Sequence, residues 1–447
     1  MTATSILYIP NDIIIEILRF LDIDDLLTNI MLVSKSMKII AHMVPVEYYL
    51  DNMYLKNYAV FAKTFPQALS LNVTDDTSLD YQDPLLFKRT PYVKSLRVLQ
   101  SGPYLSNLHY MNQLVVTKLE GCDKYLPSCK SLQFLKIDSC RDEIDYNIIS
   151  LPNIKTLHVR YRFNMPNAFL CTFINLEELC LVWCNSITDD VFAYIPKLER
   201  LYLRCNNNIS NNMFRYLSNL RLLHIEDETI TDDAFMYLSN LETLNITLKH
   251  TTMNNRNRFK EDGFKYLVNL KDLTIYHSCG DLYNCMCVKH FTSNVFTMLP
   301  KLKSLNLYRC NHLLTKQTFD ILPALDTLYI NFGYDEVCLP YEKNRFNKLK
   351  VKHIILDYGF KYAQRKDLKN LIKNGTQTLS VVKSEDSDTR FSPVFQEKII
   401  LSGHDILRFF KINRITNHAK YKDDDYIKRK QLHVNRRLEK EPYFFKL

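Results

Sequence analysis

Glycine is scarce in this chain, with only 8 residues among 447, and no two of them lie close together. The phosphate-binding loops of nucleotide enzymes, such as the P-loop and the G-x-G-x-x-G turn, need several glycines within one tight turn. The sequence therefore excludes nucleotide enzymes of both types. No Ser-His-Asp or Cys-His arrangement with a recognisable local motif occurs either, so no catalytic residue is predicted.

Long apolar runs are also missing. No stretch approaches the roughly 18 apolar residues of a membrane span, and the N-terminus, MTATSILYIPNDIIIEIL, lacks the basic start and unbroken apolar stretch of a signal peptide. We therefore expect the 12 cysteines to be free thiols in a reducing compartment, with no membrane partner. The expected location is the cytoplasm, the nucleus or both, inside a host cell if the gene is viral.

Net charge is absent from most of the chain. Residues 361–447 contain 20 Lys and Arg against 11 Asp and Glu, which accounts for the whole formal charge of +9. The tail includes Lys428–Lys430 and Arg436-Arg437, and we interpret it as a solvated basic cap, with a nuclear signal or an anionic contact as the alternative. The body of the chain is neutral, so nucleic acid is not the expected partner.

A leucine pattern, L-x-x-L-x-L, recurs through most of the chain, mostly at steps of 21 to 23 residues. Its clear copies begin at Leu132, Ile154, Leu176, Leu198, Leu220, Leu241, Leu270, Leu302 and Leu325. Weaker copies lie around Leu96–Val98, Val116–Leu119, Ile354–Leu356 and Leu379–Val381. The alternation of apolar residues predicts one short strand in each copy.

A second pattern keeps the same phase and predicts a short helix after each strand. A phenylalanine precedes an aliphatic residue by three positions, which places both on one helix face. These phenylalanines are Phe192, Phe214, Phe235, Phe264, Phe296 and Phe319. Polar pairs just upstream are expected to cap the helices, namely Asp189-Asp190, Asn211-Asn212, Asp232-Asp233 and Glu261-Asp262. Because one unit cannot bury its apolar face alone, the units must stack into a solenoid.

These residues resemble leucine-rich repeats of the cysteine-containing type. The closest match is Leu179-x-Leu181-x-x-Cys184-Asn185-x-Ile187-Thr188-Asp189, and the unit at Leu305 follows it more loosely. The resemblance implies an α/β fold with a curved parallel sheet inside and short helices outside. We expect the solenoid to span residues 56–380 with about twelve repeats, followed by a basic cap or tail at 381–447.

The first 55 residues do not carry the repeat and are expected to form three short helices. Pro10, Asn11 and Asp12 make a good helix start, and an apolar stripe follows from Ile14 to Leu21. Asp24-Asp25 is expected to start a second helix, and Ser34 to Met43 a third.

This segment resembles an F-box. The matching features are Ile9-Pro10, the helix from Asp12 to Leu18, Leu21, Asp25-Leu26-Leu27 and Val33-Ser34-Lys35, while Tyr48 or Tyr49 stands where the family has a tryptophan. The resemblance implies a non-catalytic subunit that binds a Skp1-like protein, and through it a cullin, in a ubiquitin ligase. It assigns the Skp1 contact or its supporting core to Ile9, Pro10, Ile14, Ile17, Leu18, Leu21, Leu26, Leu27 and Val33. The alternative is an interaction scaffold outside any ligase, in which these helices only cap the solenoid.

The residues between the inner leucines should face the concave side, where such arrays often bind partners. Tyr, His and Arg are common anchors at interfaces. The protein substrate is therefore expected to contact His158, Arg160, Tyr202, Arg204, His224, Tyr276, Tyr308 and Tyr329. Ordinary solvated strand residues are the alternative for all of them.

Two adjacent units carry insertions, at residues 247–260 and 276–292. We expect them to emerge on one edge and form a contact site there. The second contains His277, Cys279, Cys285, Cys287 and His290. Their spacing is not that of a standard zinc site, so neither a metal nor a cofactor is expected.

Overall fold

The fold is described from a computed structural model of the chain. The described residues are 10–18, 29–44, 67–73, 92–100, 102–108, 111–119, 129–140, 151–160, 165–226, 229–248, 259–277, 292–310, 315–331, 348–357, 373–384 and 395–402, with the single residues 85, 87, 88, 90, 126, 313, 346 and 371.

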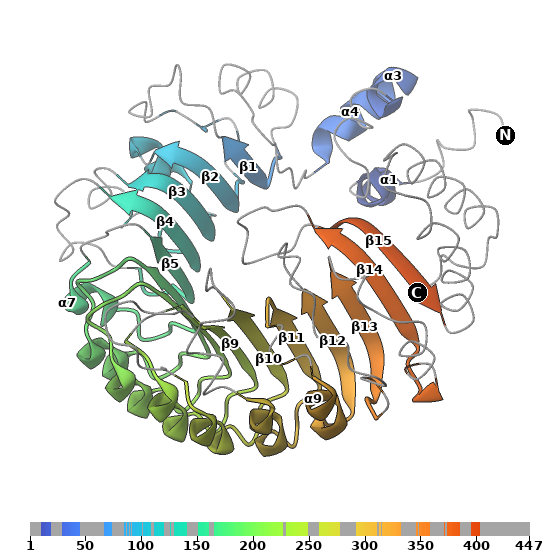
Figure 1. Ribbon diagram of the computed structural model, residues 1–447. Helices are drawn as coiled ribbons and strands as arrows, with labels where there is room; N and C mark the ends of the chain where they lie inside the picture. The colour runs from blue at the N-terminus through green and yellow to red at the C-terminus, as the bar shows by residue number, and fades with distance from the viewer. Residues whose placement is uncertain are drawn as a thin grey trace, which may run out of the picture.

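One sheet of 15 strands, paired in sequence order, forms the concave wall of a curved solenoid (Figure 1). The strands are β1 Ser70–Val73, β2 Ser95–Gln100, β3 Gln113–Leu119, β4 Phe134–Cys140, β5 Thr156–Arg160, β6 Glu178–Val182, β7 Arg200–Arg204, β8 Leu222–Glu226, β9 Thr243–Leu248, β10 Asp272–His277, β11 Ser304–Tyr308, β12 Leu325–Asn331, β13 Val351–Asp357, β14 Thr378–Ser384 and β15 Phe395–Ser402. Neighbouring strands are parallel from β1 to β14, and β15 pairs antiparallel with β14. The predicted α/β solenoid is confirmed.

Short helices cover the convex side. They are η4 Pro103–Asn107, α7 Asn167–Leu170, η7 Asp189–Tyr194, η8 Asn211–Tyr216, η9 Asp232–Tyr237, η10 Glu261–Tyr266, η11 Ser293–Met298 and α9 Lys316–Ile321. Most are 3-10 helices, which suit a segment of only six residues because each residue rises further along the axis than in an α-helix.

The core is a single continuous stack between the sheet and these helices. The register aligns leucine on leucine, so that Leu179 pairs with Leu201 and Leu201 pairs with Leu223. All six phenylalanines of the repeating pattern are buried in the same core. Each repeat thus completes the apolar surface of its neighbour, as the pattern predicted.

The weak repeat placed at Val116–Leu119 is wrong by two residues. In the sheet, Leu114 pairs with Leu96 and with Leu135, so this unit starts at Met111 and its strand pair is Leu114 and Val116. Val115 and Val116 are both β-branched, and the sequence alone does not show which of them faces the core; the register with the neighbouring strands does.

The polar pairs do not cap the helices as predicted. In two helices the residue before the pair is the cap: the hydroxyls of Ser210 and Thr231 accept from the backbone N–H groups of Asn212 and Asp233, whereas Thr188 and Lys260 make no side-chain cap bond. The side chain of the first residue of a pair instead accepts a hydrogen bond from the backbone N–H of the residue that precedes the helix of the next repeat. Asp189 accepts from the N–H of Ser210 at 2.7 Å, and Asn211 accepts from the N–H of Thr231 at 2.9 Å. Side chains at the helix starts therefore link successive repeats.

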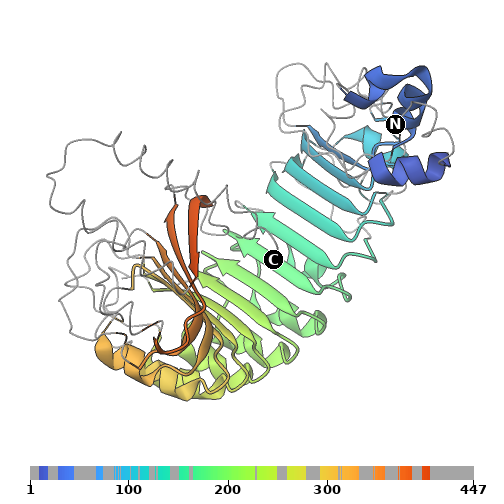
Figure 2. The ribbon, with the colours of Figure 1, turned by 90° about the vertical axis from the view of Figure 1, so that its right-hand side faces the viewer.

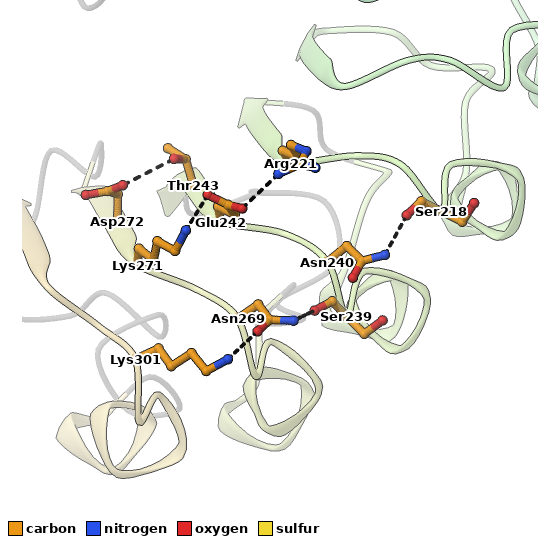
Figure 3. Close-up of polar contacts among 10 residues, drawn as sticks. All are labelled: Ser218, Arg221, Ser239, Asn240, Glu242, Thr243, Asn269, Lys271, Asp272 and Lys301. Atoms are coloured by element: carbon orange, nitrogen blue, oxygen red, sulfur yellow. Dashed lines mark hydrogen bonds and ion pairs between the residues drawn. The ribbon is translucent and has the colours of Figure 1, made fainter.

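A second polar ladder joins the loops that lead into the strands (Figure 3). The side-chain amide of Asn240 donates to the carbonyl of Ser218 at 3.0 Å, and that of Asn269 donates to the carbonyl of Ser239 at 2.8 Å. Lys301, at the same position one repeat later, donates to the Asn269 side chain at 2.6 Å. These bonds satisfy loop carbonyls that the strands leave unpaired.

Just after β6, β7 and β11 the chain turns through the left-handed region, at Trp183, Cys205 and Arg309. The next residue points into the core. Asn206 there donates to the Leu181 carbonyl and accepts from the N–H of Cys184, and Cys184 donates its thiol to the Val159 carbonyl. Cysteine and asparagine therefore fill the same role in this turn.

Three short helical segments, α1 Asn11–Leu18, α3 Met31–Val33 and α4 Lys35–Met43, lie at the β1 end of the solenoid in both views (Figures 1 and 2). Pro10 starts α1 by accepting from the N–H groups of Ile13 and Ile14, and the Ser34 hydroxyl caps α4 by accepting from the N–H of Met37 at 3.1 Å. Of the second helix predicted after Asp25, only residues 29–33 fall within the described part. No helix among the described residues is long and apolar enough to cross a membrane.

Candidate functional site

The N-terminal helices hold a small core of their own. Ile14 and Leu18 of α1 are buried against Ile40 and Ala41 of α4 and against Val44 just beyond it. Residues spaced by four on α1 point to the same side, so this pair forms one apolar stripe. Its function in the structure is to hold the helices together.

Further apolar side chains on the same helices stay exposed outside this core. They are Ile13, Ile17, Leu32, Val33, Ile39 and Met43. The α1 pair and the α4 pair are each spaced by four residues, which places each pair on one helix face. A cluster of exposed apolar side chains on so small a unit is typical of a protein interface. We call these six residues the N-terminal apolar face.

The residues predicted to bind Skp1 divide into three groups. Pro10, Ile17 and Val33 are exposed, whereas Ile14 and Leu18 are buried in the small core. Ile9, Leu21, Leu26 and Leu27 lie outside the described residues.

The concave face of the sheet shows the predicted columns. One column runs through His158, Cys180, Tyr202 and His224 on β5 to β8, and the next through Arg160, Val182, Arg204 and Glu226. His158 and Tyr202 meet edge to face at 6.4 Å between ring centroids, and Tyr202 and His224 lie 6.1 Å apart. All the predicted substrate residues from β5 to β8 therefore form one connected patch.

Two carboxylates contact the basic residues of this patch, and neither is among the predicted substrate residues. Glu178 contacts His158 Nε2 at 2.8 Å and Arg200 Nε at 2.7 Å. Glu226 lies 3.0 Å from Arg204 Nε and 3.8 Å from His224 Nε2, and only 1% of its surface is exposed. The hydrogen bond from His158, more than the pairing with Arg200, lowers the pKa of Glu178. The lowered pKa keeps Glu178 ionised near neutral pH, and both carboxylates contact basic residues of the patch.

Three tyrosines form a separate patch on β10 to β12. The rings of Tyr276 and Tyr308 stack with centroids 4.2 Å apart, and Tyr329 follows at 4.8 Å from Tyr308. Burial, the proximity of Tyr308 and the hydrogen bond to it raise the pKa of Tyr276 far above its ordinary value. The raised pKa keeps Tyr276 neutral, and the three rings offer an apolar surface that also carries hydroxyl groups.

The two predicted insertions lie mostly outside the described residues, as do Cys279, Cys285, Cys287 and His290. His277 closes β10 and is buried, which lowers its pKa to about 4. No group of three or more His, Cys, Asp or Glu residues that could hold a metal ion occurs within the described part of the chain.

Comparison with protein families matches residues 6–48 to the F-box domain. The chain carries an F-box domain. The match covers α1, α3 and α4, so the small core and the N-terminal apolar face both belong to the F-box. With the repeats described above, the protein combines an F-box with a leucine-rich-repeat solenoid, as the sequence predicted.

No curated protein matches the chain. Solved structures similar to it include an internalin of Listeria monocytogenes, with 15% identity, a TM-score of 0.43, and coverage of 66% of this chain and 82% of that one. A leucine-rich-repeat protein of Leptospira interrogans has 15% identity and a TM-score of 0.39, covering 70% and 84%. The Drosophila Toll–Spätzle complex contains a chain with 14% identity and a TM-score of 0.38, covering 66% and 44%. The fold assignment itself rests on the strand register and the continuous core.

Sequence reasoning missed several residues of both surfaces. Ile13, Leu32, Ile39 and Met43 are the further exposed apolar residues of the F-box, and they lie beside the buried residues of their helices in the sequence. Glu178 and Arg200 stand one position before the first strand leucine, and that column also faces the concave side. They are found when the position before the first strand leucine is counted as a third column of concave-face residues.

Proposed function

We propose that this chain is a non-catalytic substrate receptor of a Skp1–cullin–F-box ubiquitin ligase. The F-box binds a Skp1-like protein, which connects the receptor to a cullin, and the repeats hold a protein substrate. F-box domains and leucine-rich repeats are typical of adaptors. Such an adaptor acts by raising the effective concentration of a substrate lysine near the ubiquitin-loaded enzyme.

This proposal rests on the two sets of apolar side chains on the F-box helices, one buried in the internal core and one exposed to solvent. Ile14 and Leu18 satisfy the internal core, while Ile17, on the flank of the same helix, remains 56% exposed. A helix that served only as a cap would need one apolar face, turned toward the solenoid. The further exposed apolar side chains need a partner, and Skp1 is the partner that F-box domains generally bind.

The concave face supports the receptor role. Its basic and aromatic side chains come from many strands and are held by ion pairs and ring contacts, so they are ordered before a partner arrives. His224 and Tyr329 are buried, each 4% exposed, and the other predicted substrate residues are partly exposed. Tyr and Arg are enriched among the residues that dominate binding energy. The predicted substrate residues His158, Arg160, Tyr202, Arg204, His224, Tyr276, Tyr308 and Tyr329 are proposed to contact the substrate here.

A location in the cytoplasm or nucleus belongs to the same proposal, because the ligase works there. The cysteines in the described part of the chain are free thiols. Free thiols are usual in a reducing compartment.

Affinity capture of Skp1 tests the receptor proposal. The change is Ile17→Asp in the full chain, and the readout is the amount of Skp1 that co-purifies. We expect at least a tenfold loss, because a carboxylate in an apolar contact must be desolvated without a partner. Ile17 lies outside the small core, so circular dichroism of the variant should match that of the wild type.

The matched control is Ile174→Asp. Ile174 is 61% exposed and lies in a loop of the solenoid, far from the F-box in sequence. This variant should capture as much Skp1 as the wild type. If the wild type captures no Skp1, or if Ile17→Asp captures it normally, the receptor proposal fails and the scaffold alternative stands.

A further inference from the structure

A basic cluster lies on the concave face near the F-box end of the solenoid. Arg97 on β2, Lys136 on β4 and Arg160 on β5 face the concave side, and Asp138 on β4 is their nearest carboxylate. Both ion pairs are long: Lys136 Nζ lies 3.9 Å and Arg160 Nε lies 4.0 Å from Asp138 Oδ1. Arg97 is exposed and has no carboxylate partner among the described residues.

This pairing differs from that of the other cations on the same face. Arg200 and Arg204 lie 2.7 Å and 3.0 Å from Glu178 and Glu226. By contrast, the single carboxylate of Asp138 has to serve both Lys136 and Arg160, and both of these distances are longer.

The charges around Lys136 are mostly positive. Burial lowers the pKa of Lys136, Asp138 opposes this, and the nearby Arg160 and Arg97 lower it further. A bound anion would reverse the effect of the two arginines. The cluster therefore has the charge of an anion-binding surface.

The distance across the cluster favours a ligand with several separate negative charges over one compact anionic group. From β2 to β5 there are three strand spacings of about 4.8 Å, or about 14 Å in all. One phosphate group cannot contact side chains over that span, whereas two or three carboxylates along an extended segment can.

The tyrosine patch lies along the same direction across the sheet. From Arg160 on β5 to Tyr276 on β10 there are five strand spacings, about 24 Å, which an extended chain covers in about seven residues. Two concave-face carboxylates between them have basic partners: Glu226 is buried against Arg204, and Glu178 pairs with His158 and Arg200. One segment can therefore reach both patches.

We propose that the concave face binds an extended acidic segment of a protein. Its Asp or Glu side chains contact Arg97, Lys136 and Arg160, and an aromatic or large apolar residue about seven positions away packs on Tyr276 and Tyr308. This inference rests on the receptor function proposed above and gives the chemical class of its substrate.

Fluorescence anisotropy with the full chain tests the inference. The probe is a fluorescein-labelled peptide with Glu-Glu-Asp, a seven-residue Gly-Ser spacer and a tyrosine. We expect it to bind at least tenfold more tightly than the matched Gln-Gln-Asn peptide, and to weaken as sodium chloride rises because exposed charges are screened. Shortening the spacer to two residues should remove the contribution of the tyrosine.

Variants locate the binding. The double variant Arg97→Gln, Arg160→Gln should lose about tenfold in affinity for the acidic peptide, since each lost ion pair at a partly buried site reduces binding. The matched control, Arg221→Gln, removes an exposed cation that pairs with Glu242 at the sheet edge, and it should bind the peptide as the wild type does. Both variants should still capture Skp1, which separates this test from that of the receptor function.

Four results would overturn the inference. They are equal binding of the acidic and amide peptides, unchanged binding by the double variant, binding only when phosphoserine replaces the carboxylates, and tighter binding of a single-stranded DNA of equal charge. The last two would assign the cluster to a phosphate group or to nucleic acid.

Discussion

Replacing Arg204 by alanine removes the guanidinium that neutralises a buried carboxylate. Glu226 is 1% exposed, and its other nearby base is His224, whose Nε2 lies 3.8 Å from the Glu226 carboxylate. Breaking a buried ion pair by removing one partner typically costs about 3 to 5 kcal/mol, because the remaining charge stays desolvated. We expect Arg204→Ala to lower the free energy of unfolding of this part of the solenoid by that amount.

A matched exposed pair sets the scale for comparison. Arg221 and Glu242 lie 3.1 Å apart, but the Arg221 side chain is 61% exposed. Exposed pairs contribute about 0 to 1 kcal/mol, so Arg221→Ala should change the free energy of unfolding by no more than that. The two arginines thus separate the effect of burial from the loss of a long side chain.

The assay is urea unfolding followed by the fluorescence of Trp183. This is the only tryptophan of the chain, and its backbone N–H donates to the carbonyl of Arg204 at 2.9 Å. Its signal therefore reports on the repeats that contain the ion pair, which matters because distant repeats of a solenoid can unfold separately.

A double variant checks the cause. Replacing Arg204 by methionine and Glu226 by leucine removes both charges, and such a change is often neutral or stabilising when packing is kept. We expect it to recover most of the stability lost in Arg204→Ala. If Arg204→Ala costs less than about 1 kcal/mol, or if the double variant is less stable than the single one, the buried carboxylate does not depend on Arg204 and the reasoning is refuted.

Two further predictions concern pH and repeat packing. The pKa of Glu178 is lowered by His158 and Arg200 from an ordinary value of 4.5, so the unfolded chain binds more protons, and the stability that this carboxylate contributes is present above that value and is lost as the pH falls through the folded pKa. Glu178→Gln should therefore be less stable than the wild type at pH 7, with a difference that shrinks below pH 4.5; urea unfolding at both pH values measures it, and a pH-independent difference contradicts it. A methyl group on Gly263 would lie 2.5 Å from Asp232 Cβ and 2.7 Å from the Asp232 carbonyl oxygen, so η9 and η10 would have to separate. We expect Gly263→Ala to cost about 1 to 3 kcal/mol in thermal or chemical unfolding, whereas an unchanged or higher stability would show that the helices shift freely.

The repeating core was predictable because its cause is local. A strand buried on one face repeats its apolar residues every second position, and the helical turn returns its phenylalanine and leucine at a spacing of three. Leu179, Leu201 and Leu223 could therefore be assigned to one column before any pairing was known. The unit at Leu114 was misplaced because neighbouring β-branched residues fit either face, and only its partners Leu96 and Leu135 decide between them.

The candidate surfaces were less predictable, since they depend on which residues meet across repeats. Apolar composition marks Ile14 and Ile17 alike, yet packing against Ile40 buries one and leaves the other exposed. Asp189 looks like a helix cap in sequence, but the stacking of the next repeat turns its carboxylate toward Ser210.

By itself, the sequence determined the order of the units, the face that each strand buries, and the F-box at residues 6–48, because these follow from periodicity and residue type within short windows. The tertiary structure decided which charges are neutralised. Arg160 and Arg204 occupy the same column, and each has a carboxylate of that column on a neighbouring strand. Glu226 lies 3.0 Å from Arg204, whereas the shorter Asp138 side chain stays 4.0 Å from Arg160 and 3.9 Å from Lys136. Side-chain length and the number of cations around each carboxylate decide this difference, and both act only once the strands lie side by side.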